Sequence, residues 1–188
     1  VVRHQAAFEE ATHAAVVRGA PHLDPAPLVR VHSQCLTGDI PDSERCDCGP
    51  QRAFALRQIA ADGHGVFLYM SQEGRGIGLI NKIRAYSLQD EGLDTVEANL
   101  ALGFRDDERD YAVAAHMLMS LKIESVQLMT NNPKKIDQLT RYGIKVNGRI
   151  PHIMEPNEHN RFYLETKAVK SGHMIDFHGK QHLDEQSD

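Results

Sequence analysis

The 188-residue sequence lacks the features that mark membrane, secreted and general nucleic-acid-binding proteins. Its apolar runs, such as residues 66–70, are far shorter than the roughly 20 residues that a membrane-spanning helix needs. No basic, apolar and small-residue leader opens the chain, so nothing indicates secretion and we expect a cytoplasmic protein. Lys and Arg number 21 against 26 Asp and Glu, and the formal charge of −5 disfavours a general nucleic-acid surface.

The composition that remains is that of an ordinary globular domain. Hydrophobic residues make up 41% of the chain and charged residues 25%. A chain of this length can bury a substantial core without disulfide bonds, and one domain is expected. The sequence starts at Val1 without a Met, so we expect residues to be missing from its front.

Alternating apolar segments predict an α/β fold, a single compact domain of mixed sheet with flanking helices. The predicted strands are 13–18, 28–33, 66–70, 125–130 and 144–146, and the predicted helices are 49–62, 77–90, 110–121 and 133–142. In helix 77–90, the apolar face is expected to contain Ile77, Ile80 and Ile83. We expect the domain to span residues 1–178 and the polar, acidic tail 179–188 to be disordered.

The three cysteines form a C-x10-C-x-C pattern at Cys35, Cys46 and Cys48. A secreted disulfide framework would have an even number spread along the chain, whereas clustered thiolates are zinc ligands. Three protein ligands leave one position for water, as in a catalytic zinc site. His32 is a poor fourth ligand, because alternation along a strand ending at Cys35 turns it to the opposite face. Three reduced cysteines without a metal remain the alternative, since C-x-C is not a common zinc spacing.

A glycine-rich segment, Gln72–Gly78, follows the predicted strand 66–70 and precedes a helix. Such a turn lets backbone N–H groups approach phosphate oxygens. It matches neither the P-loop nor the dinucleotide-binding pattern, so an ordinary tight turn is an equal alternative. Arg75 within it favours an oxyanion ligand, because a guanidinium can donate two hydrogen bonds to one phosphate.

The segment Thr130–Lys135 lies at another strand end. Asn132 suits a helix N-cap and Pro133 the first helical position. Lys134 and Lys135 then fall in the first turn, where the helix dipole disfavours cations. This placement favours an anion site over two solvated lysines, which remain the alternative.

The acidic segment Asp106–Asp110 precedes a predicted helix, and its residues alone favour an ordinary charged helix start. The 11 histidines include no H-E-x-x-H cluster, and His178 and His182 in the tail are given no role. Independently of one another, these segments indicate a zinc-activated water acting on a phosphorylated small molecule.

Read together, six segments resemble GTP cyclohydrolase II in order and spacing, from about Leu28 to Met174. They are Arg30–Asp39, Arg45–Gly49, Gln72–Leu79, Asn81–Tyr86, Asp94–Asn99 and Thr130–Lys135. The resemblance implies hydrolytic opening of the imidazole ring of GTP, which yields formate, pyrophosphate and a diaminopyrimidinone ribosylamine phosphate at the start of riboflavin biosynthesis. It also implies one Zn²⁺ per chain, Mg²⁺ with the GTP phosphates and a homodimer, and leaves open a riboflavin-pathway domain, fused or separate, upstream of Val1.

By the same resemblance, zinc is held by the three cysteines, and the catalytic residues are Tyr86, Asp107 and Arg109. Tyr86 would orient or donate to the reacting group; its alternative is an aromatic residue on a helix face beside Ile83. The family pattern makes Asp107 the proton acceptor and Arg109 the nucleophile at the α-phosphate. A guanidinium has a pKa above about 12 and no available lone pair, so charge stabilisation by Arg109, oriented by Asp107, is the chemically simpler role.

The resemblance further implies a set of GTP contacts. They are Arg30, Val31, His32, Ser33, Gln34, Gln51, Glu73, Gly74, Arg75, Thr95, Thr130 and Lys135. Glu73 would accept hydrogen bonds from the ring N–H and the exocyclic amino group of guanine, which would select guanine over adenine. Arg75 and Lys135 suit the polyphosphate.

Two departures from the family pattern lie beside the expected site. Ser71 stands where an Arg is expected, and the linker Ile40–Glu44 is more polar than expected. Two other functions therefore stay open. One is a divergent paralogue that stops at a formamidopyrimidine intermediate, and the other is a non-catalytic zinc- or nucleotide-binding module.

Overall fold

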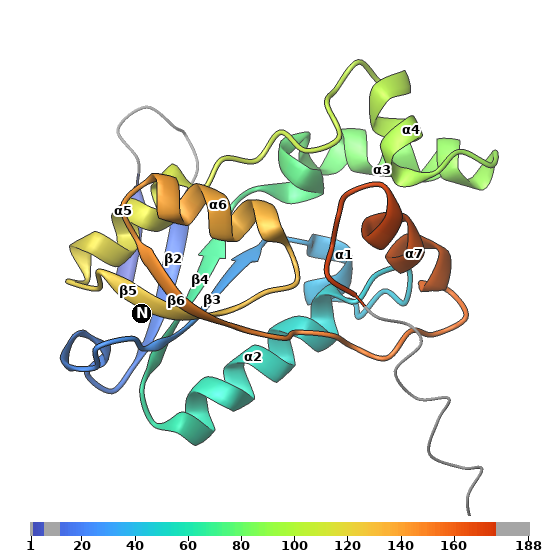
Figure 1. The fold of residues 1–188 in the computed structure, drawn as a ribbon. Coiled ribbons are helices and arrows are strands. Elements are labelled where there is room, and N and C mark those ends of the chain that lie inside the picture. Colours follow the sequence, from blue (N-terminus) through green and yellow to red (C-terminus); the bar gives the residue numbers. More distant parts are fainter. Residues whose placement is uncertain (1, 6–11, 176–188) are drawn as a thin grey trace, which may run out of the picture.

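A six-stranded mixed sheet forms the centre of the computed structural model, which describes residues 2–5 and 12–175 (Figure 1). The strand order is β1-β2-β4-β3-β5-β6. Strands β4, β3, β5 and β6 run parallel, whereas β1 and β2 are antiparallel additions at one edge. The strands are β1 (Val2–Gln5), β2 (Thr12–Arg18), β3 (Leu28–Ser33), β4 (Gly65–Met70), β5 (Ser125–Met129) and β6 (Lys145–Ile150).

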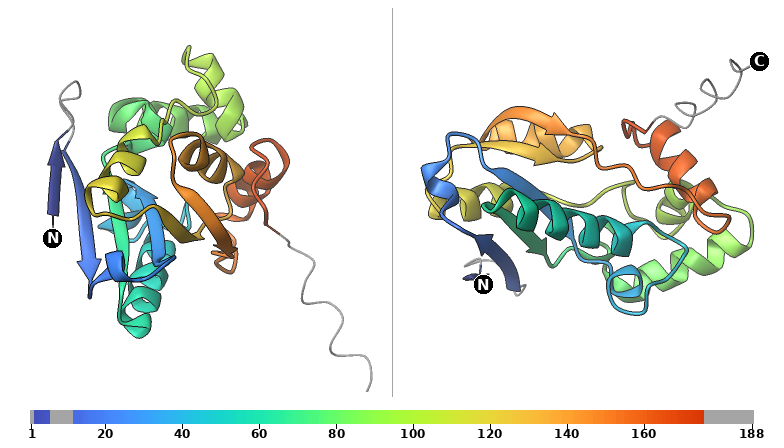
Figure 2. Two further views of the ribbon diagram at one scale, coloured as in Figure 1. Left: turned by 60° about the vertical axis from the view of Figure 1, so that its left-hand side comes forward. Right: turned by 90° about the horizontal axis from the view of Figure 1, so that it is seen from below.

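Helices cover both faces of the sheet, so the predicted single α/β domain is confirmed (Figures 1 and 2). Helix α2 lies on one face and helices α5 and α6 on the other. The helices are α1 (Leu36–Asp39), α2 (Cys48–Asp62), α3 (Gly78–Asp90), α4 (Thr95–Ala101), α5 (Ala112–Ser120), α6 (Pro133–Arg141) and α7 (Arg161–Val169), with 3-10 turns η1 (Pro21–Leu23) and η2 (Glu73–Gly76). No helix in the described part of the chain is long and apolar enough to cross a membrane.

Strand β4 has a continuously apolar sequence because both of its faces are covered by helices. Val66 and Leu68 pack into the larger core under α5 and α6, while Phe67 packs into the smaller core under α2. A central parallel strand is buried on both faces and therefore has no polar side to show. Each fully buried side chain of this size contributes about 1.5–3 kcal/mol.

The carboxyl ends of β3, β4 and β5 meet at one edge of the sheet, because these strands are parallel neighbours. The chain leaves them at Gln34, Ser71 and Thr130. Helix α2, which follows β3, lies on one face of the sheet, and α5, which precedes β5, lies on the other. In open α/β sheets, ligands bind outside such a carboxyl edge. Helices α1, α3, α4 and α7 surround this edge (Figure 1).

The predicted apolar face of α3 is wrong for two of its three residues. Ile80 is 72% exposed and Ile83 is 47% exposed, whereas Lys82 and Ala85 are buried. The helix covers the cysteine-containing loop rather than an apolar core, and Lys82 is buried there because it bonds Glu73 and Cys35. Hydrophobic periodicity cannot detect a helix whose buried face is partly polar.

Most other element predictions hold, with shifted ends. Asn132 caps α6 by accepting from the Lys134 N–H at 2.9 Å, and Pro133 is its first residue, as predicted. Gly63 ends α2 in the left-handed conformation with φ of 84°. The predicted helix 110–121 begins only at Ala112, and β6 is longer than predicted. The expected tail 179–188 lies outside the described residues, and the domain limit at residue 178 stays a prediction.

Candidate functional site

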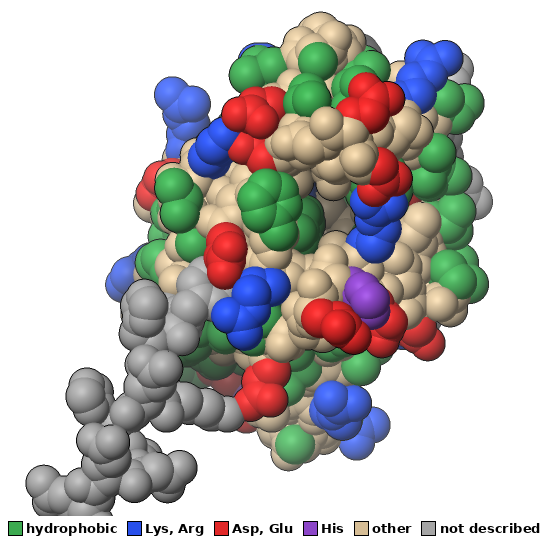
Figure 3. All heavy atoms as spheres, turned by 90° about the vertical axis from the view of Figure 1, so that its right-hand side faces the viewer, with side chains coloured by type: hydrophobic (Ala, Val, Ile, Leu, Met, Phe, Trp, Pro, Cys, Tyr) green, Lys and Arg blue, Asp and Glu red, His purple; other side chains and the backbone are tan. Residues whose placement is uncertain are grey.

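Two adjoining pockets lie at the carboxyl edge of the sheet, on the face that is hollowed in Figure 3. The thiolate pocket, of about 620 Å³, is lined by Ser33, Gln34, Cys35, Cys46, Cys48, Gln72, Glu73, Gly74, Arg75, Ile77, Lys82, Ala85, Tyr86, Gln89, Thr95, Asn99, Arg109 and Tyr163. The cationic pocket, of about 600 Å³, is lined by Arg30, His32, Ser33, Cys48, Gln51, Arg75, Arg109, Thr130, Asn131, Asn132, Lys135, Tyr163, Lys167 and His173. Their shared residues, Arg75 and Arg109 among them, form the junction between the two.

The three cysteine sulfurs lie within 4.8 Å of one another, as the metal-site prediction requires. Cys35 follows β3 as the N-cap residue of α1, and Cys48 is the first residue of α2. The Sγ atoms of Cys35 and Cys46 are 3.7 Å apart. All three are reduced, and Cys35 and Cys46 are buried.

The surroundings of the sulfurs fit a metal ion. A Cβ atom on Gly38 would lie 2.7 Å from Cys46 Sγ and 3.3 Å from Cys35 Sγ, so only glycine allows the backbone this close. Lys82 Nζ donates to Cys35 Sγ at 3.1 Å and to Thr37 Oγ1 at 2.9 Å. A nearby ammonium offsets part of the negative charge that three thiolates bring together.

Interactions among the three thiols also favour the deprotonated form of one of them, Cys35. Hydrogen bonds from Cys46 and Cys48, with the charge of Lys82, hold the pKa of Cys35 far below its usual value. The pKa of Cys46 is raised to about 11, chiefly because its proton is donated to Cys35. A bound metal removes the remaining thiol protons, since it binds the deprotonated form.

His32 is absent from this group, as predicted, but for a different reason. Strand β3 ends at Ser33, so strand alternation does not extend to Cys35. His32 instead bonds Asp39 Oδ1 through Nε2 at 2.9 Å and stacks on Phe67 and Tyr69. Burial lowers the pKa of His32, which favours the neutral ring.

Tyr86 lines the thiolate pocket together with the cysteines, and the exposed Ile83 beside it does not. Its ring faces Arg45, whose Cζ lies 4.7 Å from the ring centroid. Burial raises the pKa of Tyr86, so its hydroxyl keeps its proton at neutral pH and can donate a hydrogen bond.

The glycine-rich turn forms η2, where Gly74 and Arg75 both have φ near +60°. A non-glycine residue in this conformation is strained, and such strain concentrates at functional sites. Arg75 pairs with Asp106 at the junction of the pockets. Glu73 accepts from the Leu36 N–H at 2.6 Å and from Lys82 at 2.8 Å, so guanine recognition by Glu73 would need its remaining lone pairs and stays a prediction.

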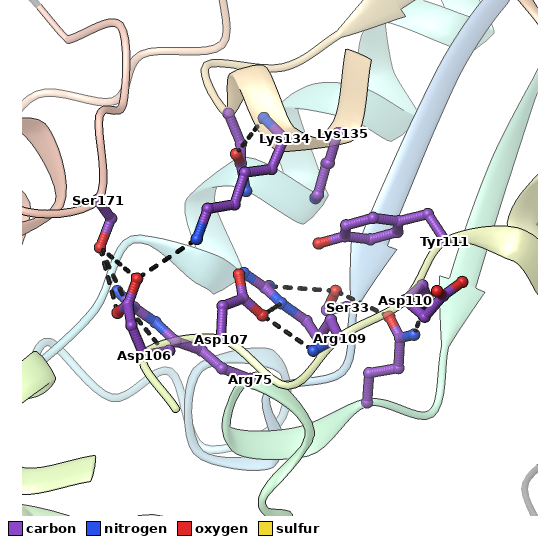
Figure 4. A network of polar contacts seen from close by, with 12 residues as sticks. Ser33, Arg75, Asp106, Asp107, Arg109, Asp110, Tyr111, Lys134, Lys135 and Ser171 are labelled. Atoms are coloured by element: carbon purple, nitrogen blue, oxygen red, sulfur yellow. Dashed lines mark hydrogen bonds and ion pairs between the residues drawn. The ribbon is translucent and has the colours of Figure 1, made fainter. Parts of the chain in front are cut away.

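Asp107 and Arg109 form a two-point ion pair at the junction of the pockets (Figure 4). Arg109 donates from Nε to Oδ1 at 2.8 Å and from Nη2 to Oδ2 at 2.6 Å. Burial acts to lower the pKa of Arg109, but neighbouring Tyr111 and Asp107 outweigh it and raise that pKa above its usual value. Arg109 therefore stays a cation, and Asp107 orients it toward the pockets.

Of the GTP contacts predicted on and just after strand β3, some line the pockets and one lies in the core. Arg30 enters the cationic pocket and donates to the Met129 carbonyl at 2.9 Å and to Gln51 of α2. Val31 is fully buried in the larger core, so only its backbone is available, and its carbonyl accepts from Lys135. Ser33 lines both pockets, and Gln34 lines the thiolate pocket.

The two lysines of α6 differ. Lys135 is 5% exposed, lines the cationic pocket with Thr130 and donates to the Val31 carbonyl at 2.7 Å. Lys134 is half exposed and lies 3.5 Å from Asp106. The anion-site prediction therefore applies to Lys135. Thr95, the first residue of α4, lines the other pocket, the thiolate pocket.

Sequence reasoning assigned no role to several pocket residues. Lys82 lies four residues before Tyr86 on one helix, and that spacing could have placed both on one face. Tyr163, Lys167 and His173 come from α7 and the segment after it, where no motif indicated a site.

The fold and the two pockets define a class, an α/β domain with a three-cysteine cluster that could hold a metal ion and an adjoining pocket lined by cations. The family profile for GTP cyclohydrolase II matches residues 1–151. The chain therefore belongs to the GTP cyclohydrolase II family.

Individual relatives agree with this assignment. The chain is 58% identical over 163 residues to "GTP cyclohydrolase-2" of Pseudomonas syringae pv. tomato, covering 86% of this chain and 78% of that protein. It is 53% identical over 171 residues to "GTP cyclohydrolase-2" of Histophilus somni, covering 91% and 79%. It is 55% identical over 166 residues to "Riboflavin biosynthesis protein RibBA" of Bacillus subtilis, covering 88% of this chain but only 42% of that protein.

Proposed function

We propose that this chain is a zinc-dependent GTP cyclohydrolase II. The observation that carries the proposal is the junction of a three-thiolate cluster with a pocket of buried cations, at a spacing set by one sheet edge. The purine base would lie in the thiolate pocket and the phosphates in the cationic pocket. Family membership and the relatives named GTP cyclohydrolase-2 support this substrate.

Cys35, Cys46 and Cys48 would hold the zinc, which supplies a Lewis acid and a water of lowered pKa for attack on the imidazole ring. Tyr86 keeps its proton and would donate to the reacting base from the same pocket. Arg109, held by Asp107, stays positively charged and would stabilise charge developing on the α-phosphoryl group rather than act as a nucleophile. Mg²⁺ would neutralise further phosphate charge.

The proposal extends to four further properties: a catalytic domain spanning residues 1–178, a homodimeric assembly, a cytoplasmic location and riboflavin-pathway partners. The relatives named RibBA support the last of these. Sedimentation of the purified chain tests the assembly.

The proposed activity is tested by incubating the zinc-loaded protein with GTP and Mg²⁺ and measuring formate and pyrophosphate. Equimolar release of both supports the full reaction. Accumulation of a formamidopyrimidine with pyrophosphate but little formate would instead indicate a paralogue that stops early. No turnover at any zinc loading would leave only a zinc- or nucleotide-binding module.

A further inference from the structure

Helix α7 and the segment after it form a wall of the cationic pocket. Tyr163 and Lys167 enter from the helix, and His173 enters from the segment that follows. The family profile ends at residue 151, before this helix begins. In Figure 1 the helix lies at the end of the molecule that carries α1 and the start of α2, away from the sheet.

Bonds to the other parts of the site hold this segment in place. Lys167 Nζ lies 3.1 Å from Asp47 Oδ1, in the loop between the second and third cysteines. The Met174 N–H donates to the Asn131 carbonyl at 2.8 Å, at the turn after β5. Ser171 accepts from Arg75 at 3.3 Å, a contact that Figure 4 shows beside Asp106. The segment is thus bonded to three of the segments that line the site: the cysteine loop, the turn after β5 and η2.

The cationic pocket has more hydrogen-bond donors than acceptors. Its described lining contains five Lys and Arg side chains and no Asp or Glu. Lys135 has no described carboxylate within ion-pair distance, and burial together with Arg30 and Arg109 lowers its pKa well below the usual value. Arg30 Nε, a donor on a side chain more than nine-tenths buried, has no hydrogen-bond partner among the described residues.

His173 lies among the same positive charges. Burial, followed by the charges of Lys167 and Arg75, lowers its pKa to about 3. Closely spaced buried cations with unsatisfied donors are stabilised by a multiply charged anion, because each phosphate oxygen accepts several charge-assisted hydrogen bonds.

We propose that Lys167 and His173 are nucleotide-binding residues that contact the phosphates beyond the α-phosphate. This inference rests on the proposed function for the orientation of the nucleotide: the base lies at the cysteines and the α-phosphate at the Arg75–Arg109 junction. The cationic pocket continues from that junction toward Lys135, Lys167 and His173, where only the distal phosphates reach.

The test compares a guanosine monophosphate with a triphosphate analogue that cannot release pyrophosphate. Calorimetry on the zinc-loaded chain with Mg²⁺ would use GMP and a GTP analogue whose α–β bridging oxygen is a methylene. We expect Lys167→Met to lower the affinity for the analogue by about 10- to 100-fold, since one charge-assisted bond is lost, and the affinity for GMP by less than about twofold. His173→Gln should weaken only the analogue, by about 3- to 10-fold.

Lys170→Met is the matched control, because Lys170 is the C-cap residue of the same helix, pairs with Asp94 and Glu97 and does not line either pocket. It should leave both affinities unchanged. Thermal unfolding and zinc content establish that each variant is folded and metal-loaded, and Lys167→Arg should retain most of the affinity.

The outcomes separate this proposal from the proposed function. If Lys167→Met binds the analogue as tightly as the parent chain, or loses GMP equally, Lys167 acts only through Asp47 and the inference is overturned. If the parent chain binds no guanine nucleotide, the proposed function fails. Titration with inorganic triphosphate then tests the cationic pocket separately from the base. Binding that depends on Lys167 supports a polyphosphate site there, and binding that does not depend on Lys167 refutes the inference.

Discussion

The thiolate pocket and the cationic pocket are built in opposite ways. The three candidate metal ligands lie within Cys35–Cys48, and one loop and two short helical starts bring them together. The cations of the neighbouring pocket come from β3, η2, the loop before α5, α6 and α7. A site whose residues come from one short segment can be recognised in the sequence as a motif. A site whose residues come from five segments forms only when the chain folds.

The two pockets should also respond differently to substitution. A metal held by three protein ligands would have no substitute when one is lost, so each cysteine should be indispensable. Five cations would share the charge of one polyphosphate, so removal of one should weaken binding without abolishing it.

At the thiolate pocket, Cys46→Ser should remove bound zinc and lower turnover of GTP by at least about a thousandfold, because a serine hydroxyl is a poor replacement for a thiolate. Metal analysis and formate release measure the two effects. Ile40→Ser is the control, since Ile40 lies in the same loop, is 71% exposed and does not line the thiolate pocket. A Cys46→Ser chain that keeps both zinc and turnover would exclude Cys46 as a ligand.

At the junction, Arg109→Ala should slow pyrophosphate release by about 100- to 1000-fold, because one buried cation aimed at the developing charge is lost. Zinc should remain bound. Arg105→Ala, which removes an exposed partner of Glu108 nearby, should have no such effect. Unchanged turnover in the Arg109 variant would remove this residue from the mechanism.

Behind the cationic pocket, acidification should weaken the fold through His152. This ring is fully buried, bonds the Gln51 carbonyl at 3.0 Å, and has its pKa lowered to about 3 by burial and by Arg30. The unfolded chain therefore binds this proton first as pH falls. The neutral ring's contribution is complete above about pH 6.5 and is lost progressively toward pH 3.

For this one group, the free energy of unfolding should fall by about 2 kcal/mol between pH 7 and pH 5. Urea denaturation of the parent chain and of His152→Gln at both pH values measures it, because the variant lacks this part of the pH dependence. Parallel losses in the two proteins would show that other groups account for the acid sensitivity.

Prediction from sequence succeeded where the determining interactions are local. Helix α6 begins where an N-cap asparagine and a first-position proline place it, and β4 is buried on both faces as its continuous apolar run predicts. The cysteine spacing led to the three sulfurs that the fold brings together. Capping, strand burial and ligand spacing depend on neighbours in the chain.

It failed where a partner is distant in sequence. Ile80 and Ile83 were expected inside, yet α3 buries Lys82, because Glu73 and Cys35 provide a charged partner across the pocket. Nothing local distinguishes Lys135 from Lys134, although only Lys135 reaches the Val31 carbonyl and the cationic pocket.

Composition, short-range periodicity and motif spacing are enough to predict the α/β class, the three thiols and their family from the chain alone. Folding is needed to show which cations share a pocket, why His32 pairs with Asp39, and that α7 lines the site. The physical reason is that a thiolate's chemistry belongs to its own side chain. The chemistry of a buried cation depends on the charges around it, and those come from residues as far apart in the chain as Arg30 and His173.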